Sequence, residues 1–419
     1  MSLYGRSISR RSVVIGAAGI GIATTIRPAF AQDASPEASP GGEEGGPGMP
    51  PLPAGAIVVA EGLWNPGNLA VGDDGTLYIA EGGIFGGEES EGPPASPDPN
   101  ASPVASPPPL IPPQVSQVTA DGTQSVLTME TGGVGIGVSG GTIYVSTGGG
   151  SVGSGIIPLP QENTVTSIDV PTGAVTLVAS LGQYEVDNNP DGTDVNPNLY
   201  GLAIDAAGAV FVADAGGNTI YKIDPASGEF SLFAVVPNLT DLTGATPTAE
   251  ELAMQPGPRQ PVPTSITIDD AGTLHVTLLS EGWSGPSVLV YSPDGTYTAG
   301  ISGVPMIVNS ALGPDGLLYL SQLTADFAGE QPAPGAVFRI TTDGAAEPVV
   351  EGLFFPHGIA FDADGNLFVT TNSIISGPDM PLGMVVRIDG IATPAQIAKG
   401  PRASYLKGCN TAWGPLLMS

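Results

Sequence analysis

The residues best suited to metal chemistry lie in a short acidic segment, YEVDNNPDGTDVNPN, within residues 183–199. Oxygen-bearing side chains alternate there around Gly192, at Asp187, Asn189, Asp191 and Asp194. This order matches the opening of an EF-hand-type loop, in which alternate side chains wrap one hard cation and the glycine allows a sharp turn. The bidentate Glu of such a loop is absent, because Asn198 stands in its place. We therefore expect a weak Ca²⁺ site, with an Asx-rich turn that caps the backbone as the alternative.

Other catalytic motifs are missing from the chain. There is no H-E-x-x-H pair and no P-loop. Two histidines, His275 and His357, are too few for a histidine-rich zinc site. His357 beside an acid could act as a general acid or base, but the spacing does not demand it. The single cysteine, Cys409, excludes an intramolecular disulfide.

The elements that position these residues are given by a phrase that recurs six times. It consists of an apolar strand, a tight Asp/Gly turn and an apolar-aromatic-apolar strand, as in GLAIDAAGAVFVAD from Gly201 and GIAFDADGNLFVTT from Gly358. The other copies begin at Asn68, Ile136, Ser265 and Ser310. Third and fourth strands follow in each unit, as in TIYKID from Thr219 and then GEFSLF. Six units of four antiparallel strands predict an all-β fold, a six-bladed β-propeller of the NHL/YVTN-like type.

The repeat also predicts how the blades pack and how the ring closes. The second strands carry an aromatic residue between blades, at Tyr78, Tyr144, Phe211, Tyr319 and Phe368. His275 occupies this place in the fourth unit, so we expect a buried core histidine. The strand IVVA from Ile57 resembles the fourth strand before the sixth unit and could complete the last blade, whereas PAQIAKG near the C-terminus competes for that position.

Most long connections join the second strand to the third or one unit to the next. Antiparallel pairing puts both kinds of connection on the same side of the propeller, which we call the loop-bearing face, and ligand sites are expected there. Polar residues before the first strands and at the ends of the second strands form a ring at the mouth of the central channel. We select Asn68, Glu81, Tyr200, Asp214, Asn309 and His357 as candidate ligand-binding residues. Such a ring suits a metal or a small polar ligand, and the alternative is that it is merely solvated.

The charge of the chain limits its partners. It contains 41 Asp and Glu against 11 Lys and Arg, for a net charge of −30. Four of the basic residues precede the first acid, Asp33. Such a surface repels phosphate backbones and anionic lipid, so nucleic-acid binding is excluded, whereas cations and neutral or cationic ligands are compatible with it.

The N-terminus has the pattern of an export signal. Residues 1–31 contain paired Arg10 and Arg11, a Gly/Ala-rich apolar stretch and an A-x-A site ending at Ala31, the features of a Tat signal peptide. A retained N-terminal anchor is the alternative. We expect a mature, monomeric, extracytoplasmic (periplasmic or secreted) protein with no membrane span. A Pro/Gly-rich linker over residues 32–53 would precede the propeller, residues 54–400, which carries a Pro-rich inserted loop at 86–113, and a tail over 401–419 would follow it.

The run LGQYEVDNNPDGTDVNPNLYGLAIDAAGAVFVADAGGNTIYKID resembles the ScyD/ScyE family, named for scytonemin-biosynthesis clusters, and VVAEGLWNPGNLAVGDDGTLYIAEGG fits the same pattern. The resemblance covers about residues 57–389 and implies an exported NHL-like propeller. It carries over no catalytic motif, and the insert at 86–113 and the tail depart from the family pattern.

Two functions follow as hypotheses. The first is a non-catalytic protein that binds a small molecule or a protein partner through its loop-bearing face. The alternative is a metal-dependent hydrolase or lyase of the gluconolactonase-like type, with Glu81, Asp214 and Asn309 as metal ligands in the central channel. The two differ in whether these side chains converge.

Overall fold

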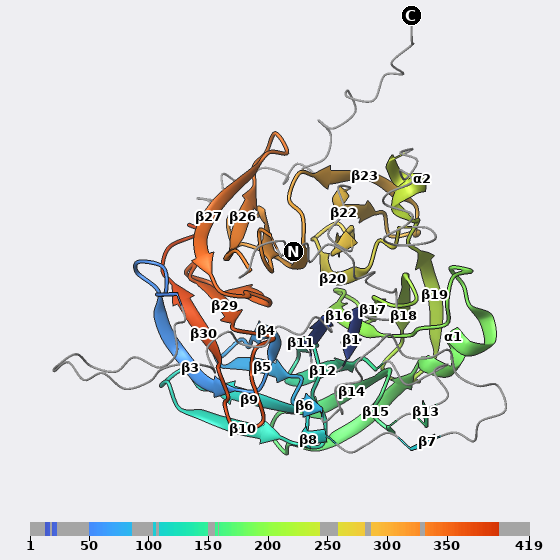
Figure 1. Ribbon diagram of the computed structural model, residues 1–419, viewed down its shortest axis with the longest axis horizontal. Helices are drawn as coiled ribbons and strands as arrows, with labels where there is room; N and C mark the ends of the chain where they lie inside the picture. Colours follow the sequence, from blue (N-terminus) through green and yellow to red (C-terminus); the bar gives the residue numbers. More distant parts are fainter. Residues whose placement is uncertain are drawn as a thin grey trace, which may run out of the picture.

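The computed structural model describes residues 50–85, 109–149, 159–243, 259–280, 286–326 and 332–393, and four short strands elsewhere. Six four-stranded antiparallel sheets stand around one axis, as Figure 1 shows, so the predicted six-bladed β-propeller is confirmed. Most of the signal segment, of the linker and of the insert, and all of the tail, lie outside the described residues.

Each blade runs from an inner strand at the axis to an outer strand at the circumference. Blade 1 contains β4 (Pro66–Val71), β5 (Leu77–Glu81), β9 (Gln114–Val118) and β10 (Gln124–Thr128). Blade 2 contains β11 (Gly135–Ser139), β12 (Thr142–Thr147), β14 (Thr164–Asp169) and β15 (Val175–Ser180). Blade 3 contains β16 (Leu199–Ile204), β17 (Val210–Asp214), β18 (Thr219–Ile223) and β19 (Phe230–Val235).

The second half of the ring repeats this order. Blade 4 contains β20 (Pro263–Ile268), β21 (Leu274–Leu278), β22 (Pro286–Tyr291) and β23 (Tyr297–Ser302). Blade 5 contains β24 (Ile307–Leu312), β25 (Leu318–Gln322), β26 (Gly335–Ile340) and β27 (Ala346–Leu353). Blade 6 contains β28 (Ile359–Phe361), β29 (Leu367–Thr371), β30 (Gly383–Ile388) and β3 (Ile57–Leu63).

Blade 6 closes the ring with a strand from the start of the domain. β3 pairs antiparallel with β30, with Val58 opposite Val386. Of the two closing strands that the sequence left open, the N-terminal one therefore completes the last blade. A core containing Leu63, Leu69 and Val385 then packs blade 6 against blade 1.

The recurring Asp/Gly turns are maintained by one hydrogen-bond pattern. The Asp205 carboxylate accepts bonds from the backbone N–H groups of Ala207 and Ala209, both at 2.9 Å, while Gly208 has a φ of +89°. Asp269 and Asp362 do the same in their blades. An aspartate and a residue that tolerates positive φ are thus required at fixed places, which is why the phrase repeats so visibly.

The apolar residues of the phrase pack between neighbouring blades, as predicted. The predicted aromatic positions all belong to these inter-blade cores, with Tyr144 at the margin of its core: Tyr78, Tyr144, Phe211, Tyr319 and Phe368. His275 is buried and lies 3.6 Å from Asp269, so it is the core histidine that the repeat predicted.

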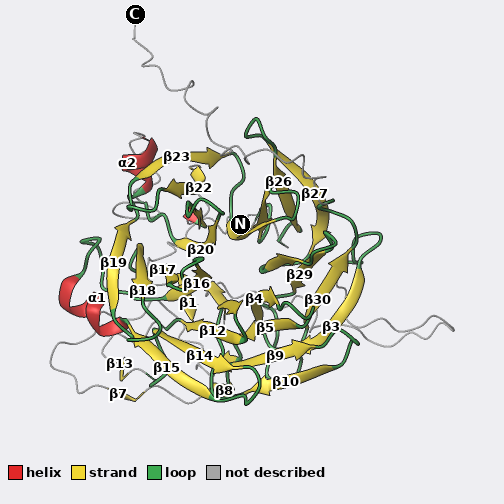
Figure 2. Ribbon diagram, turned by 180° about the vertical axis from the view of Figure 1, so that it is seen from behind, coloured by secondary structure: helices red, strands yellow, loops and turns green. Residues whose placement is uncertain are grey.

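The long connections lie on one face, as the strand pairing requires. They include α1 (Gly182–Asn188), between blades 2 and 3, and α2 (Leu239–Thr243), between blades 3 and 4. Figure 2 shows both helices at the circumference. At the base of the insert, β6 (Ile84–Phe85) pairs with β8 (Pro109–Ile111). Four further short strands form two pairs, β7 (Val104–Ala105) with β13 (Ile156–Ile157) and β1 (Val13–Gly16) with β2 (Gly19–Ile22). None of the helices within the described residues has the length and apolarity to cross a membrane.

Candidate functional site

The predicted polar ring is joined by hydrogen bonds across the propeller axis. Tyr200 belongs to blade 3 and His357 precedes the inner strand of blade 6, so the two residues come from opposite sides of the ring. The Tyr200 hydroxyl lies 2.5 Å from Nε2 of His357, and Nδ1 of His357 lies 3.1 Å from Oδ1 of Asn68. A neutral imidazole protonated on Nδ1 satisfies both contacts. The three side chains therefore bond to one another and close the axis at this level.

Apolar side chains from the starts of the inner strands surround this bridge. Tyr200 belongs to a buried cluster with Val134, Val262, Met306 and Phe355, from four other blades. Burial lowers the pKa of His357 to about 3 and raises that of the Tyr200 phenol, because each charged form would lose its hydration. This environment favours a neutral, structural histidine.

The fourth ring residue, Asn309, is also occupied. Its Nδ2 group donates to Oγ of Ser265 at 3.1 Å, and its Oδ1 accepts from the backbone N–H of Ile359 at 3.2 Å. Asn309 therefore ties blade 5 to blades 4 and 6. None of the ring residues Asn68, Tyr200, Asn309 and His357 is more than 5% exposed.

Glu81 lies at the end of β5 and is fully buried. Its Oε2 accepts from the backbone N–H of Trp64 at 2.6 Å, and its Oε1 accepts from Nε2 of Gln114 and Oγ of Ser116. Burial raises the pKa of Glu81, and these three donors oppose the rise. Glu81 thus fastens the turn between β3 and β4 to blade 1, so both of its oxygens are in use.

Asp214 lies at the end of β17 in blade 3 and only one of its oxygens has partners. Oδ1 accepts backbone N–H bonds from Asn198, Gly216 and Gly217, whereas the buried Oδ2 accepts none. Burial raises the pKa of Asp214 to about 6 against the opposing effect of those three bonds.

The acidic segment after α1 does not form the predicted loop around a single point. The helix includes Asp187, whose Oδ1 accepts from Gln183 at 2.9 Å, and Asp187 and Asp194 are exposed. Asn189 caps the helix with a φ of +39° and its Nδ2 donates to the Thr193 carbonyl.

Asp191 forms the turn that follows. Its Oδ1 accepts from the backbone N–H of Thr193 at 2.9 Å. Its Oδ2 accepts from the Thr193 hydroxyl at 2.7 Å and from Nδ2 of Asn218 at 2.8 Å. Asp191 therefore has the geometry of the Asx-turn alternative.

Sequence reasoning missed Glu185, which is the most unusual acid of the described residues. It lies in α1, it is fully buried, and neither of its carboxylate oxygens has a hydrogen-bond partner. Burial, followed by the nearby Asp214, Asp191 and Asp194, raises its pKa to about 8. A β-carbon added at Gly217 would lie 3.0 Å from Oδ2 of Asp214 and 3.1 Å from Oε2 of Glu185. The two unpartnered oxygens therefore border the same small space, which we call the blade 3 acid pair.

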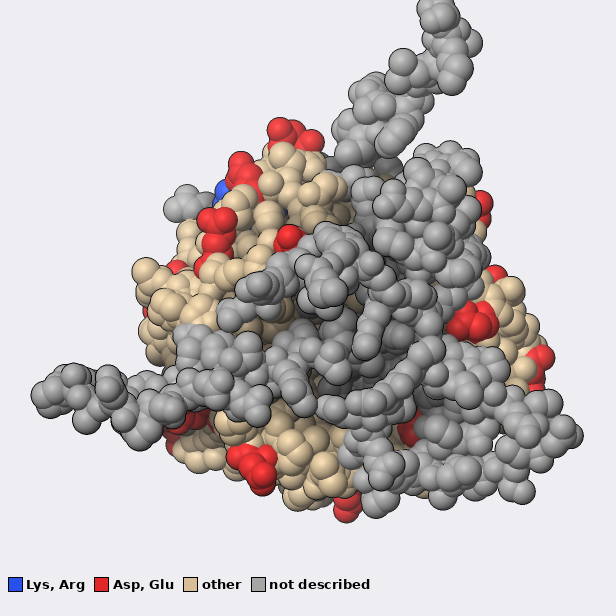
Figure 3. Space-filling model, in the orientation of Figure 1, with Lys and Arg blue, Asp and Glu red and all other residues tan. Residues whose placement is uncertain are grey.

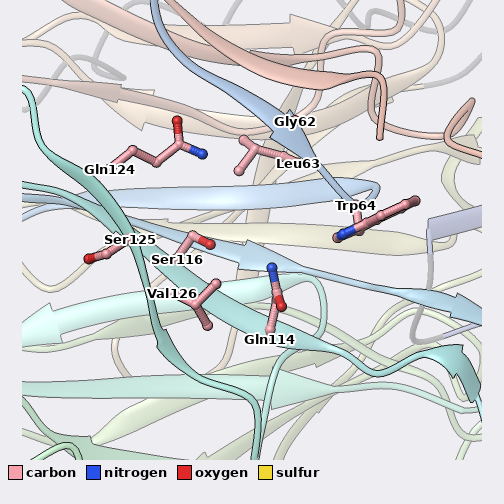
Figure 4. A pocket seen from close by; sticks show the side chains of 8 residues that line it. All are labelled: Gly62, Leu63, Trp64, Gln114, Ser116, Gln124, Ser125 and Val126. Atoms are coloured by element: carbon pink, nitrogen blue, oxygen red, sulfur yellow. The ribbon is translucent and has the colours of Figure 1, made fainter. Parts of the chain in front are cut away.

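Sequence reasoning also missed a pocket of about 330 Å³ at the seam where blade 6 meets blade 1. Eight residues line this seam pocket: Gly62, Leu63, Trp64, Gln114, Ser116, Gln124, Ser125 and Val126. In Figure 4 the Trp64 indole and the Gln114 side chain lie at one end, and Gln124 and Ser125 at the other. None of the lining side chains is charged. The sequence does contain a signal for Trp64. At the start of the first copy residues 63–68 read LWNPGN, whereas at the start of the last copy residues 353–358 read LFFPHG.

The amides of the seam pocket are fixed by bonds to their surroundings. Gln124 bonds to both the N–H and the carbonyl of Glu61, at 3.1 and 2.8 Å. Gln114 donates through Nε2 to Glu81, which leaves its Oε1 as an acceptor. The pocket thus presents an indole, a fixed amide oxygen and hydroxyl groups to whatever enters it.

Acidic side chains dominate the visible charged surface outside this pocket, as Figure 3 shows for the described residues. The exposed cations Lys222, Arg339 and Arg387 each lie within 4 Å of an acid, at Asp205, Glu347 and Asp389. Such a surface favours neutral or cationic ligands.

No hydrogen bond among the described residues links Glu81, Asp214 and Asn309 to one another. They belong to blades 1, 3 and 5, and the oxygens of Glu81 and Asn309 are occupied by protein donors. No group of three or more His, Cys, Asp or Glu in the described part of the chain has the arrangement of a metal site. Within the ring, hydrogen bonds join Asn68, His357 and Tyr200.

Comparisons with known proteins show a likeness in fold. No protein-family model and no curated protein matches the chain. A structural genomics protein of unknown function from Bacteroides thetaiotaomicron is similar in structure, with a TM-score of 0.51 and 11% identity over 80% of this chain and 75% of that one. A gluconolactonase from Xanthomonas campestris has a TM-score of 0.49 at 14% identity, over 82% and 98% of the two chains. A streptogramin B lyase has a TM-score of 0.45 at 13% identity, over 80% and 97%. At 11% identity, the first of these structures shows a likeness of fold alone.

Proposed function

We propose that this chain is an exported, non-catalytic β-propeller that binds a small, neutral, polar ligand such as a saccharide in the seam pocket. The observation that carries the proposal is the pocket's lining, in which an indole, amides and hydroxyls occur without a charged group. The export follows from the twin-arginine segment at residues 1–31 and from the resemblance to the ScyD/ScyE family.

The size and composition of the pocket support a ligand of this class. A volume of about 330 Å³ is at the lower end of the range for small-molecule sites. An indole face accepts the C–H surface of a sugar ring, and fixed amide and hydroxyl groups bind its hydroxyls without a rearrangement cost. A phosphorylated or carboxylated ligand would find no basic partner in this lining.

The alternative, a metal-dependent hydrolase or lyase at the central channel, has less support. Its ligands would be Glu81, Asp214 and Asn309, but these come from three blades and two of them already bond to protein donors. The bond between Tyr200 and His357 also occupies the axis, where a substrate would have to enter.

A thermal-melting screen with neutral mono- and disaccharides tests the proposal. We expect at least one compound to raise the melting temperature of the wild type, and we expect Trp64→Ala to lose that response. Trp283→Phe is the control, because it removes a different tryptophan of the chain. Mass spectrometry of the recovered compound should show it unchanged.

Two results would oppose the proposal. Conversion of a compound in a divalent-metal-dependent manner would favour the hydrolase or lyase. A stabilisation that Trp64→Ala retains in full would place the ligand elsewhere.

A further inference from the structure

We propose that the blade 3 acid pair, Glu185 and Asp214, binds a hard divalent cation of the calcium class. This site differs from the sequential loop Asp187–Asp194, because the loop pattern includes neither of its two acids. It is also independent of the seam pocket, which lies at the junction of blades 6 and 1.

The first argument is that the oxygens facing this space have no partners in the protein. Both oxygens of Glu185 and Oδ2 of Asp214 are buried without a hydrogen bond. Glu185 is 0% and Asp214 is 1% exposed, so water does not satisfy them from the surface. Buried carboxylates without partners are costly, and they are normally paired or bound to a metal.

The second argument concerns how the charge is neutralised. No basic side chain of the described residues forms an ion pair with either acid. The alternative to a bound cation is a proton that neutralises the pair. The two carboxyls would then share this proton in a short hydrogen bond between one oxygen of each. One oxygen of each acid borders the position of a β-carbon at Gly217, so both face one space in which an ion would contact the two carboxylates.

The third argument is the type of donor. The unpartnered atoms of the pair are carboxylate oxygens, which are the ligands of Ca²⁺ and Mg²⁺ and not those of softer metals. Ca²⁺ tolerates irregular coordination and two carboxylates match its charge. The exposed Asp187 and Asp194 and the half-buried Asp191 give the surroundings a negative potential that attracts cations.

The experiment uses the mature protein after removal of metals with a chelator. At saturating Ca²⁺ we expect the wild type to melt about 3 °C or more above the metal-free form, because a ligand that binds only the folded state stabilises it. Glu185→Gln keeps the shape of the side chain and removes its charge. This variant should fold, melt at or above the metal-free wild type and lose the Ca²⁺ response.

Asp187→Asn is the matched control, because it removes an exposed charge from the same helix. It should retain the Ca²⁺ response. Tb³⁺ luminescence excited through tyrosine gives a second readout, since the ring of Tyr184 lies 5.7 Å from that of Tyr221, whose pKa is raised by burial and then by the nearby Asp214 and Glu185. Saturable luminescence should appear in the wild type and in Asp187→Asn but not in Glu185→Gln.

Three outcomes would overturn the proposal. The first is that the wild type shows no saturable response to Ca²⁺ or Tb³⁺, which would mean that a proton neutralises the acid pair. The second is that Glu185→Gln responds as the wild type does, which would place the ion elsewhere. The third is that Asp187→Asn loses the response, which would place the ion in the sequential loop.

Discussion

Among single residues, His357 shows how burial decides whether a polar side chain does chemistry. A histidine in a central channel is an attractive general base, but this one contacts Tyr200 and Asn68 and is 1% exposed. Its pKa of about 3 keeps it neutral at physiological pH. The same pKa makes His357 a source of acid sensitivity.

We predict that His357 destabilises the protein in acid. Its pKa is about 3 in the folded state and 6.5 as its ordinary value, so between these values the unfolded chain binds the additional proton. The free energy of unfolding should therefore fall as the pH drops below 6.5, by up to about 1.4 kcal/mol per pH unit from this group. Above pH 6.5 the effect vanishes. Urea unfolding of the wild type and His357→Asn across this range measures it, and parallel curves for the two proteins would contradict the assignment.

A second prediction concerns Gly217 beside the blade 3 acid pair. Gly217→Ala would place a methyl group 3.0 Å from Oδ2 of Asp214 and 3.1 Å from Oε2 of Glu185, in the space assigned to the cation. We expect Ca²⁺ affinity to fall by about tenfold, equal to about 1.4 kcal/mol of binding energy. The metal-free variant should melt close to the metal-free wild type. Calorimetric titration with Ca²⁺ checks this, and an unchanged affinity would show that the ion does not occupy this space.

Among the elements, β3 has the most demanding role because it closes the ring. Among the described strands it pairs only with β30, and the turn that follows it is fastened by Glu81 through the Trp64 N–H. A buried carboxylate that accepts three bonds at such a junction is structural, although at sequence level it was grouped with the channel residues.

We predict that Glu81→Ala loosens this closure. It would leave the Trp64 N–H, Nε2 of Gln114 and the Ser116 hydroxyl without their acceptor, at a cost of about 3 kcal/mol or more of unfolding free energy. Glu61→Ala, at an exposed position of β3, should change little. Urea unfolding and limited proteolysis near β3 would detect the difference. Equal stability of the two variants would refute the anchoring role.

The elements also show how far the sequence could predict the structure. The propeller was predictable because each Asp/Gly turn needs the same residues in the same places, as at Asp205 and Gly208. Closure of the ring by β3 could not be predicted, because two terminal segments of the sequence fitted the last blade equally well. Glu185 was missed because burial of one acid in a seven-residue helix depends on packing against blade 3, and the EF-hand pattern drew attention to Asp187 instead. The seam pocket was missed because β3 and β10 are distant in the repeat order and meet only when the ring closes.

For the whole molecule, the acidic composition and the N-terminal segment bear on where the protein works. Seven basic residues remain after residue 31 against 41 acids, so the folded surface attracts cations and repels anionic polymers. A folded propeller that is closed by its first strand is suited to a pathway that exports folded cargo. Export through the twin-arginine segment stays a prediction.

We predict that replacing both Arg10 and Arg11 by Lys prevents export. The precursor should accumulate in the cytoplasm, whereas Arg6→Lys, outside the pair, should be exported normally. Fractionation with detection of a C-terminal tag measures both. Normal export of the double variant would exclude the twin-arginine route.

The central claim is that the propeller holds a neutral polar ligand in the seam pocket and does not transform it. The most direct test is a fluorescence titration of the Trp283→Phe/Trp413→Phe variant, in which Trp64 is the remaining tryptophan of the chain. With neutral saccharides as probes, the account predicts a saturable change in Trp64 emission and full recovery of the unchanged saccharide. An emission that no saccharide alters, or a probe that is consumed, would contradict it.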